Sequence, residues 1–414
     1  MLTRHAFDSP SPMTSRNALR VLANAMLLKP STRQTFVDMG HESKLCDVMK
    51  RDSFDDEFLV SRILFLTTYE TNIKLEPIIE QCHLAEIMTE RLAKHVTVVQ
   101  DQSTKAGKAK ADPMEDMALA EILRLLFNVT HFCSEKVTAF TQTIPHILVL
   151  LLKRDLPTTK PLDPPFGSLV NTLINLDLSS ENVQSSFYPE NDPNAIATKL
   201  IELLDLSLKQ YKDNDLEQTV TPLVGVIRTV HENGPHDVRQ FIRNRLLPTE
   251  EDRNEVLGHS ETLASRLLRN TTNPLTPQLR ELISHLLYEM SDKDPSKFVE
   301  HVGYGFASGF LFQNNIPVPE SASGGSVDET KKAFNPITGQ FLDREKFADV
   351  PEMTDEEKER EAERLFVLFE RLVVSHYDHN KCIVLNEHQT QKDRYHRCGK
   401  SSHKGVSRRP HSGA

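Results

Sequence analysis

The sequence contains no tryptophan and only 15 glycines in 414 residues. Charged residues make up 26% of the chain and hydrophobic residues 38%. This composition favours helices over a β-rich fold. We therefore expect an all-α protein.

The chain also lacks the features of secreted and membrane-spanning proteins. Its five cysteines are odd in number, widely spaced and without a CxxC pair, which argues against a disulfide framework and favours buried thiols in a reducing compartment. No apolar run is long enough to span a membrane, and the N-terminus has no apolar core of signal-peptide length. We expect a cytoplasmic protein without an integral membrane segment.

Signatures of catalysis are missing as well. The sequence has no GxGxxG, GxxxxGK[ST], GxSxG or HExxH motif, so an enzyme would need a site of unrecognised pattern. Acidic residues outnumber basic ones by 59 to 49, and the net charge of −10 disfavours general nucleic-acid binding. The cysteines and histidines after His376 lack the spacing of zinc ligands. We expect no cofactor and no metal.

Amphipathic helices are what the sequence does contain. When the polar insertion Asp101–Asp116 is set aside, the early helices recur at roughly the 40 to 47 residues of armadillo and HEAT repeats. Such helices bury their apolar faces by stacking, so we predict an armadillo/HEAT-like α-solenoid over 17–311, with a plain helical bundle as the alternative. The strongest helical periods cover Asn17–Leu28, Leu59–Glu70, Ala118–Phe132, Gly167–Leu178, Val220–Asn233 and Thr276–Met290.

The segments before and after the predicted solenoid do not continue its pattern of repeated amphipathic helices. We expect 1–16 to be disordered and 312–350, with its prolines, glycines and serines, to form a flexible linker. A C-terminal docking helix is predicted over 351–375, with Leu365, Phe366 and Phe369 on its apolar face. The basic segment 376–414 is either a disordered tail or an artefact of gene annotation.

The segment Lys297–Leu311 joins the two regions. Gly303, Gly305 and Gly309 flank two aromatic residues in this segment, and glycine both accepts positive φ and allows close backbone approach. We expect a helix to stop here, and the simplest interpretation is a helix C-cap.

Recurring polar side chains near the ends of the repeat helices form the candidate binding site. An asparagine amide can hold the backbone of a bound peptide because it both donates and accepts hydrogen bonds, and guanidinium groups suit carboxylates. The alternative is that the asparagines stabilise the following loops and the arginines extend into solvent. The candidates are Asn24, Asn128 and Asn175, together with Arg62, Arg124 and Arg228.

Two hydroxyl side chains in the predicted linker are candidate phosphorylation sites. Ser326 lies in the acidophilic-kinase pattern Ser-x-x-Glu, and Thr330 follows the same acidic pair. A phosphate there would add up to about two negative charges.

Three segments of the chain resemble a known family. They are Lys297–Leu311 (KFVEHVGYGFASGFL), Asn335–Gln340 (NPITGQ) and Met353–Leu372. Their order and the Ser/acidic linker between them resemble the synembryn family of Gα guanine-nucleotide exchange factors and chaperones, in its fungal form. The stretches RVLANAM, RILFLTT, LLFNVTHF and RNRLLP are similar to the same family, so the resemblance covers about Asn17 to Leu372.

The resemblance implies an armadillo-like solenoid whose concave groove binds the C-terminal helix of a Gα subunit, either GDP-bound or nucleotide-free. It further implies nucleotide exchange, folding assistance and phosphorylation of the acidic linker. We expect a cytoplasmic monomer that performs no covalent chemistry, and the sequence leaves open whether it is recruited to the plasma membrane. Exchange requires that the empty Gα state be bound more tightly than the nucleotide-bound state. Only sixteen residues precede Asn17, where family members carry further repeats, so we expect part of the groove to be missing. A scaffold for another peptide or helix is the alternative function.

Overall fold

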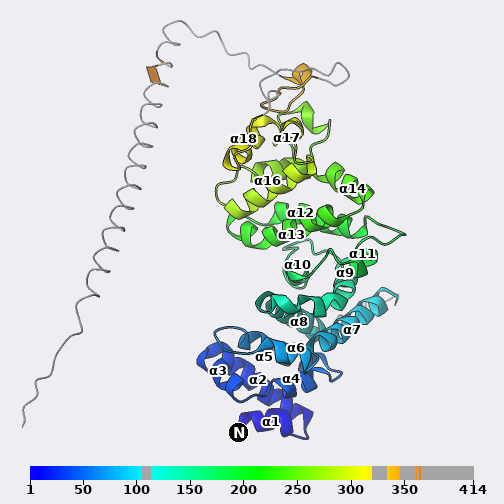
Figure 1. Cartoon of the computed structure of the whole chain (residues 1–414), viewed down its shortest axis with the longest axis vertical. Coiled ribbons are helices and arrows are strands. Elements are labelled where there is room, and N and C mark those ends of the chain that lie inside the picture. Colours follow the sequence, from blue (N-terminus) through cyan, green and yellow to red (C-terminus); the bar gives the residue numbers. More distant parts are fainter. Residues whose placement is uncertain (105–112, 319–332, 346–359, 361–362, 365–414) are drawn as a thin grey trace, which may run out of the picture. The chain divides into compact units, whose positions relative to one another are not determined.

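The computed structural model describes residues 1–104, 113–318, 333–345, 360 and 363–364. In this part of the chain all the long elements are helices, and the only strand-like feature is an antiparallel bridge between Phe334 and Phe341. The predicted all-α solenoid is confirmed (Figure 1). Met1–Glu345 forms one unit, and only three residues of the second unit, Lys346–Ala414, are described.

Eighteen α-helices and three 3-10 helices follow one another in the described residues. The first half contains α1 Leu2–Asp8, α2 Pro12–Leu28, α3 Ser31–Asp38, α4 Glu42–Met49, α5 Phe54–Thr67, α6 Leu75–Glu80, α7 Leu84–Thr104, α8 Pro113–Phe132, η1 Ser134–Thr143 and α9 Ile144–Lys153. The second half contains α10 Phe166–Asn175, α11 Glu181–Phe187, α12 Ala195–Gln210, α13 Asp213–Asn233, α14 His236–Leu246, η2 Asp252–Asn254, α15 Leu263–Asn270, α16 Pro277–Met290, α17 Pro295–Val302, α18 Tyr304–Gln313 and η4 Leu342–Arg344.

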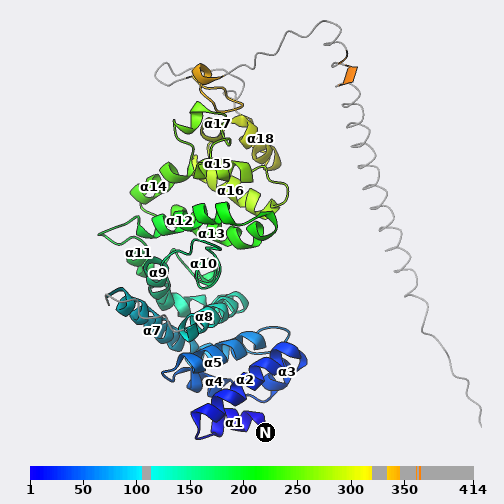
Figure 2. The same cartoon turned by 180° about the vertical axis from the view of Figure 1, so that it is seen from behind.

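The helices of Met1–Glu345 pack in two rows. The first, which we call the groove row, consists of α2, α5, α8, α10, α13 and α16, and each helix packs against the next. The second row consists of α4, α7, α9, α12 and α14, packed in the same sequential way. Figures 1 and 2 show these helices succeeding one another from α1 to α18. One continuous hydrophobic cluster joins them, as expected when each repeat buries its apolar face against its neighbours.

Polar caps determine where several helices begin. The Ser53 hydroxyl accepts a hydrogen bond from the Asp56 backbone N–H (3.2 Å) and caps α5. The first turn of α5 holds Asp55, Asp56 and Glu57, whose charges stabilise the positive end of the helix dipole. The helix therefore begins about one turn before the predicted Leu59.

The prediction that 1–16 is disordered is wrong. These residues form α1 and the first part of α2. Ala6 is completely buried, and the buried Ser15 hydroxyl donates to the Ala6 carbonyl (2.5 Å). The segment is ordered because α1 packs against α2 and extends the solenoid by one helix.

The predicted helix stop at the glycine-rich segment is confirmed. Gly303 has a φ of +79° and ends α17, and its N–H donates to the Val299 carbonyl (2.9 Å). A Cβ at Gly303 would lie 3.2 Å from the Ile337 carbonyl oxygen, and one at Gly305 would lie 3.1 Å from the same atom. The two glycines therefore serve both the helix end and the close approach of a later segment.

That later segment, 333–345, is docked on the solenoid, and we call it the strap. The Tyr304 N–H donates to the Pro336 carbonyl (2.7 Å), and the Gly305 N–H donates to the Ile337 carbonyl (3.0 Å). The prediction of a flexible linker over 312–350 is therefore wrong for the strap, because its backbone groups pair with those of α18. The residues 319–332 and 346–350 lie outside the described part of the chain.

A buried arginine holds the strap from the other side. Arg253 donates through Nη1 to the Gly339 carbonyl (2.9 Å), and through Nη2 to the Glu300 and His301 carbonyls at the end of α17. Its guanidinium also lies 5.0 Å from the centre of the Phe334 ring. Burial lowers the pKa of Arg253, and the carbonyls at the negative end of α17 compensate the buried charge.

Candidate partner-binding groove

A groove of about 370 Å³ opens between four helices of the groove row, α5, α8, α10 and α13. Apolar and polar side chains line it in about equal share, and such a mixed surface can bind the two faces of an amphipathic helix. The residues around it include Phe65, Tyr69, Arg124, Phe127, Asn128, Ser168, Asn171 and Gln218.

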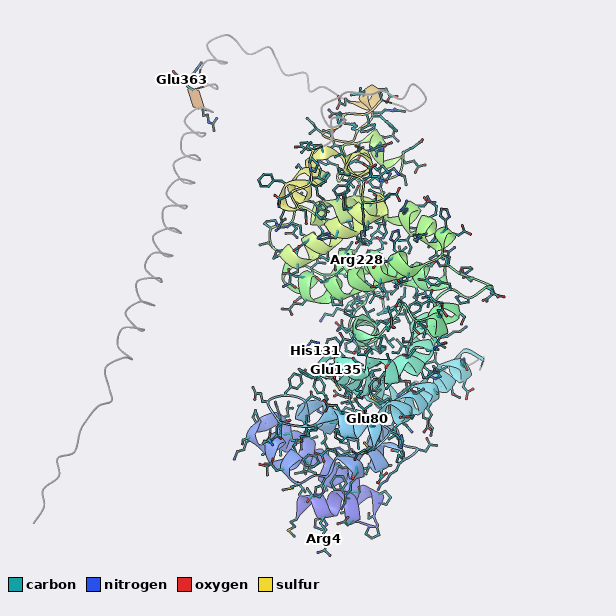
Figure 3. All side chains as sticks on the ribbon, in the orientation of Figure 1. Arg4, Glu80, His131, Glu135, Arg228 and Glu363 are labelled. Atoms are coloured by element: carbon teal, nitrogen blue, oxygen red, sulfur yellow. The ribbon has the colours of Figure 1, made fainter. Side chains whose placement is uncertain are left out.

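Aromatic side chains gather at one end of this groove, where α5 and α8 end. Tyr69 packs edge-on against Phe65 (5.2 Å between ring centres) and against Phe132 (6.3 Å). His131, labelled in Figure 3, stacks parallel to Phe127 at 6.0 Å. Phe132 is 53% exposed and Tyr69 39% exposed. We call these five residues the aromatic cluster, and its exposed faces are available to a ligand.

Two of the predicted arginines meet beside the groove. Arg62 Nη1 and Arg124 Nη1 both donate to Oε1 of Glu121, at 3.0 and 2.8 Å. The Glu121 side chain is only 4% exposed, whereas that of Arg124 is 45% exposed. Two guanidinium groups share one carboxylate, so this triad carries an excess positive charge that is suited to an anionic group of a ligand.

Asn128 borders the groove, but its side chain is almost fully buried. It is 3% exposed, its Nδ2 donates to the Thr68 hydroxyl (2.7 Å), and its Oδ1 accepts from the Tyr69 hydroxyl (3.4 Å). The amide therefore connects α8 to the residues that follow α5.

Asn175 and Arg228 make similar connections further along the groove row. Asn175 Nδ2 donates to the Phe127 carbonyl (3.0 Å) and ties α10 to α8. Arg228, labelled in Figure 3, forms two hydrogen bonds with Glu289 (2.8 and 2.6 Å) and ties α13 to α16. Burial alone would raise the pKa of Glu289, but the Arg228 guanidinium outweighs it and the pKa is lowered. Arg228 also borders a second hollow, of about 280 Å³, beside Ile174.

The remaining predicted site residues are not brought to the groove in the described structure. Asn24 is exposed on α2 and does not line either hollow. Leu365, Phe366 and Phe369 lie outside the described residues, as do Ser326 and Thr330.

The sequence reasoning missed three groove residues. Asn171 lies one helical turn before Asn175 on the exposed face of α10, a spacing that could have indicated it. Ser168 lies on the same face. Tyr69 lies inside the predicted helix Leu59–Glu70, but the site search looked for recurring asparagines and arginines, and a tyrosine does not fit that pattern. In the structure Tyr69 lies two residues after the end of α5 at Thr67.

A second cluster of ionisable residues is enclosed between α5, α7 and α8. His95 contacts Glu57 through Nε2 (2.7 Å) and Glu115 through Nδ1 (2.5 Å), and all three side chains are buried. Arg91 donates to Glu57 (2.6 Å), and Arg154 donates to Glu115 (2.6 Å). Burial by itself lowers the pKa of His95, but the hydrogen bonds to the two carboxylates outweigh it and the pKa is raised. The cluster holds three helices together and is closed to a substrate.

None of the described helices is long and apolar enough to cross a membrane. The family model of the guanine nucleotide exchange factor synembryn matches residues 1–376 of this chain. The chain belongs to the synembryn family.

Similar proteins in this family include both fungal and vertebrate members. A synembryn-like chaperone of Schizosaccharomyces pombe is 26% identical over 278 residues, which cover 62% of this chain and 52% of that protein. Chaperone Ric-8A of Xenopus tropicalis is 25% identical over 350 residues, covering 78% of this chain and 64% of its own length. Chaperone Ric-8A of Macaca fascicularis is 25% identical over 392 residues, covering 88% and 72%. The chain thus spans between about half and three quarters of the length of these synembryn relatives.

Proposed function

We propose that this chain is a guanine-nucleotide exchange factor and folding chaperone for Gα subunits. The observation that carries the proposal is the match to the exchange-factor family over residues 1–376. The relatives named as chaperones support the second activity. We further propose that the chain acts as a monomer in the cytoplasm, can be recruited to the plasma membrane, and performs no covalent chemistry.

In this proposal the groove between α5, α8, α10 and α13 binds the C-terminal helix of Gα. Its aromatic cluster offers apolar contact area to one face of an amphipathic helix. The triad of Arg62, Arg124 and Glu121 has an excess positive charge next to that area, and Arg124 itself lines the groove. A carboxylate of the ligand would therefore be attracted to the exposed guanidinium edge.

Exchange follows from binding only if the chain distinguishes between Gα states. A protein that binds nucleotide-free Gα more tightly than GDP-bound Gα shifts the population toward the empty state and accelerates GDP release. The same preference would hold a newly made Gα chain in a folded, nucleotide-receptive state. Binding of GTP would then release the Gα subunit.

The release of labelled GDP from purified Gα, with and without this chain, tests the exchange activity. We expect the release rate to rise with the concentration of the chain and to saturate. Binding of Gα with no acceleration of GDP release would contradict exchange and favour the alternative of a scaffold for a helix. A variant with Arg62→Ala, Arg124→Ala and Glu121→Gln leaves no buried carboxylate without a cation. It should need a higher concentration for the same rate, because the positive charge that attracts the Gα C-terminus is gone.

A further inference from the structure

Tyr69 is the one member of the aromatic cluster that has a hydroxyl group, and this hydroxyl has a hydrogen-bond partner within the protein. The residue is 39% exposed and lines the groove. Its ring is fixed between Phe65 and Phe132. Its hydroxyl donates to the Asn128 Oδ1 atom at 3.4 Å.

Asn128 is in turn fixed by the end of α5. Its Nδ2 donates to the Thr68 hydroxyl (2.7 Å), and that hydroxyl donates to the Phe65 carbonyl (2.7 Å). The Phe65 carbonyl, in the last turn of α5, also accepts from the Thr68 N–H (3.2 Å), so this chain of hydrogen bonds ends on the C-terminus of α5. Both ends of the buried Asn128 amide are used within the protein, so this side chain is poorly placed to contact a ligand directly.

The direction of these hydrogen bonds leaves one group free for a ligand. A tyrosine hydroxyl carries one proton and two acceptor lone pairs. Because the proton is directed to Asn128, acceptor capacity remains at the hydroxyl oxygen of a residue that is part of the groove wall. An N–H donor of a bound helix, from its side chains or from an unpaired backbone amide, is the chemistry that this oxygen fits.

We propose that Tyr69 is a recognition residue that accepts a hydrogen bond from the bound helix, and that Asn128 is a positioning residue that acts through Tyr69. This inference rests on the proposed function, since the ligand is taken to be the C-terminal helix of Gα. It assigns the direct contact to a residue outside the regular helices and gives the buried asparagine an indirect role.

A double-mutant cycle with a fluorescently labelled Gα C-terminal peptide tests the inference. Tyr69→Phe keeps the ring and removes only the hydroxyl, so the dissociation constant should rise about two- to tenfold, the usual range for one lost hydrogen bond. Asn128→Ala should weaken binding in the wild-type background but change it less than about twofold in the Tyr69→Phe background, because its effect depends on the hydroxyl. Tyr188→Phe serves as the matched control, since the Tyr188 hydroxyl donates to the Val230 carbonyl away from the groove.

The thermal midpoint of each variant separates recognition from folding. Tyr69→Phe should unfold close to the wild-type temperature while binding more weakly. If Asn128→Ala lowers affinity equally in both backgrounds, Asn128 contacts the ligand itself and the inference is overturned. Unchanged affinity of Tyr69→Phe also overturns it while leaving the proposed function intact. Failure of the wild-type chain to bind the peptide overturns both.

Discussion

Replacing Gly339 by alanine should loosen the strap from the solenoid. Gly339 has a φ of +69°, a conformation that costs an alanine about 1 to 2 kcal/mol. A Cβ at this position would also overlap the side chain of Leu257, with Cγ only 2.8 Å away. Leu257 is 1% exposed, so it cannot move freely, and such overpacking costs about 1 to 3 kcal/mol. We therefore expect docking of the strap to weaken by about 2 to 5 kcal/mol.

Hydrogen exchange of two amides reports this docking directly. The N–H groups of Tyr304 and Gly305 donate to strap carbonyls, so they exchange only when the strap detaches or the whole unit unfolds. A loss of 2 kcal/mol corresponds to an acceleration of about 30-fold, at 1.4 kcal/mol for each factor of ten. The increase should be confined to residues near the strap.

Two other glycines serve as controls that separate the cost of the positive φ from the cost of the overlap with Leu257. Gly40 also has a positive φ, +63°, but a Cβ there would meet no atom within 4 Å, so Gly40→Ala measures backbone strain alone. Gly309 lies inside α18 with equally open space around it, and Gly309→Ala should stabilise the helix by about 0.5 to 1 kcal/mol. If Gly339→Ala costs no more than Gly40→Ala in urea denaturation and leaves the Tyr304 and Gly305 exchange rates unchanged, the account of the docked strap is wrong.

Three further predictions concern buried charges, and each is measured by urea denaturation. The pKa of His95 is raised in the folded state. The stabilisation by its protonated form is therefore fully present below about pH 6.5 and is lost as the pH rises through the folded-state pKa. His95→Gln should remove this dependence of stability on pH, and if the dependence persists, His95 is not its source. Burial lowers the pKa of His231 to about 4, so the folded state binds fewer protons and stability should fall as the pH drops from about 6.5 to 4, whereas His231→Asn should show a flatter profile. Replacing both Arg62 and Arg124 by alanine leaves the buried Glu121 carboxylate without a cation, which should cost about 3 to 5 kcal/mol, and a third change, Glu121→Gln, should restore most of the loss; no restoration would show that the carboxylate is not the cause.

The helical class and the order of the repeats could be predicted because they depend on periodic apolar residues. Helix starts could not be placed as well. The first turn of α5 contains three acidic residues that resemble a polar loop in the sequence, yet they stabilise the helix N-terminus. Residues 1–16 have too few apolar side chains to indicate a core position, and their order depends on the contact between α1 and α2.

The hydrogen-bond partners of the site residues could not be predicted from the sequence. Arg124 and Asn128 could be placed near the end of one helix, but Asn128 bonds to Thr68, which is 60 residues earlier in the chain. The sharing of Glu121 by Arg62 and Arg124 likewise requires α5 and α8 to be side by side. The strap resembles a linker in sequence because it is held largely through backbone hydrogen bonds, which leave no side-chain pattern.

The proposed function places the C-terminal helix of Gα in the groove between α5, α8, α10 and α13. A direct test is an anisotropy titration of the labelled Gα C-terminal peptide into the wild type and into Ser168→Trp, which fills the groove from α10. Glu202→Trp places the same side chain at an exposed position of α12, away from the groove row, and serves as the control. We expect saturable binding by the wild type and by Glu202→Trp, and loss of binding by Ser168→Trp. If all three proteins bind equally, or the wild type does not bind, the groove is not the site for the Gα helix.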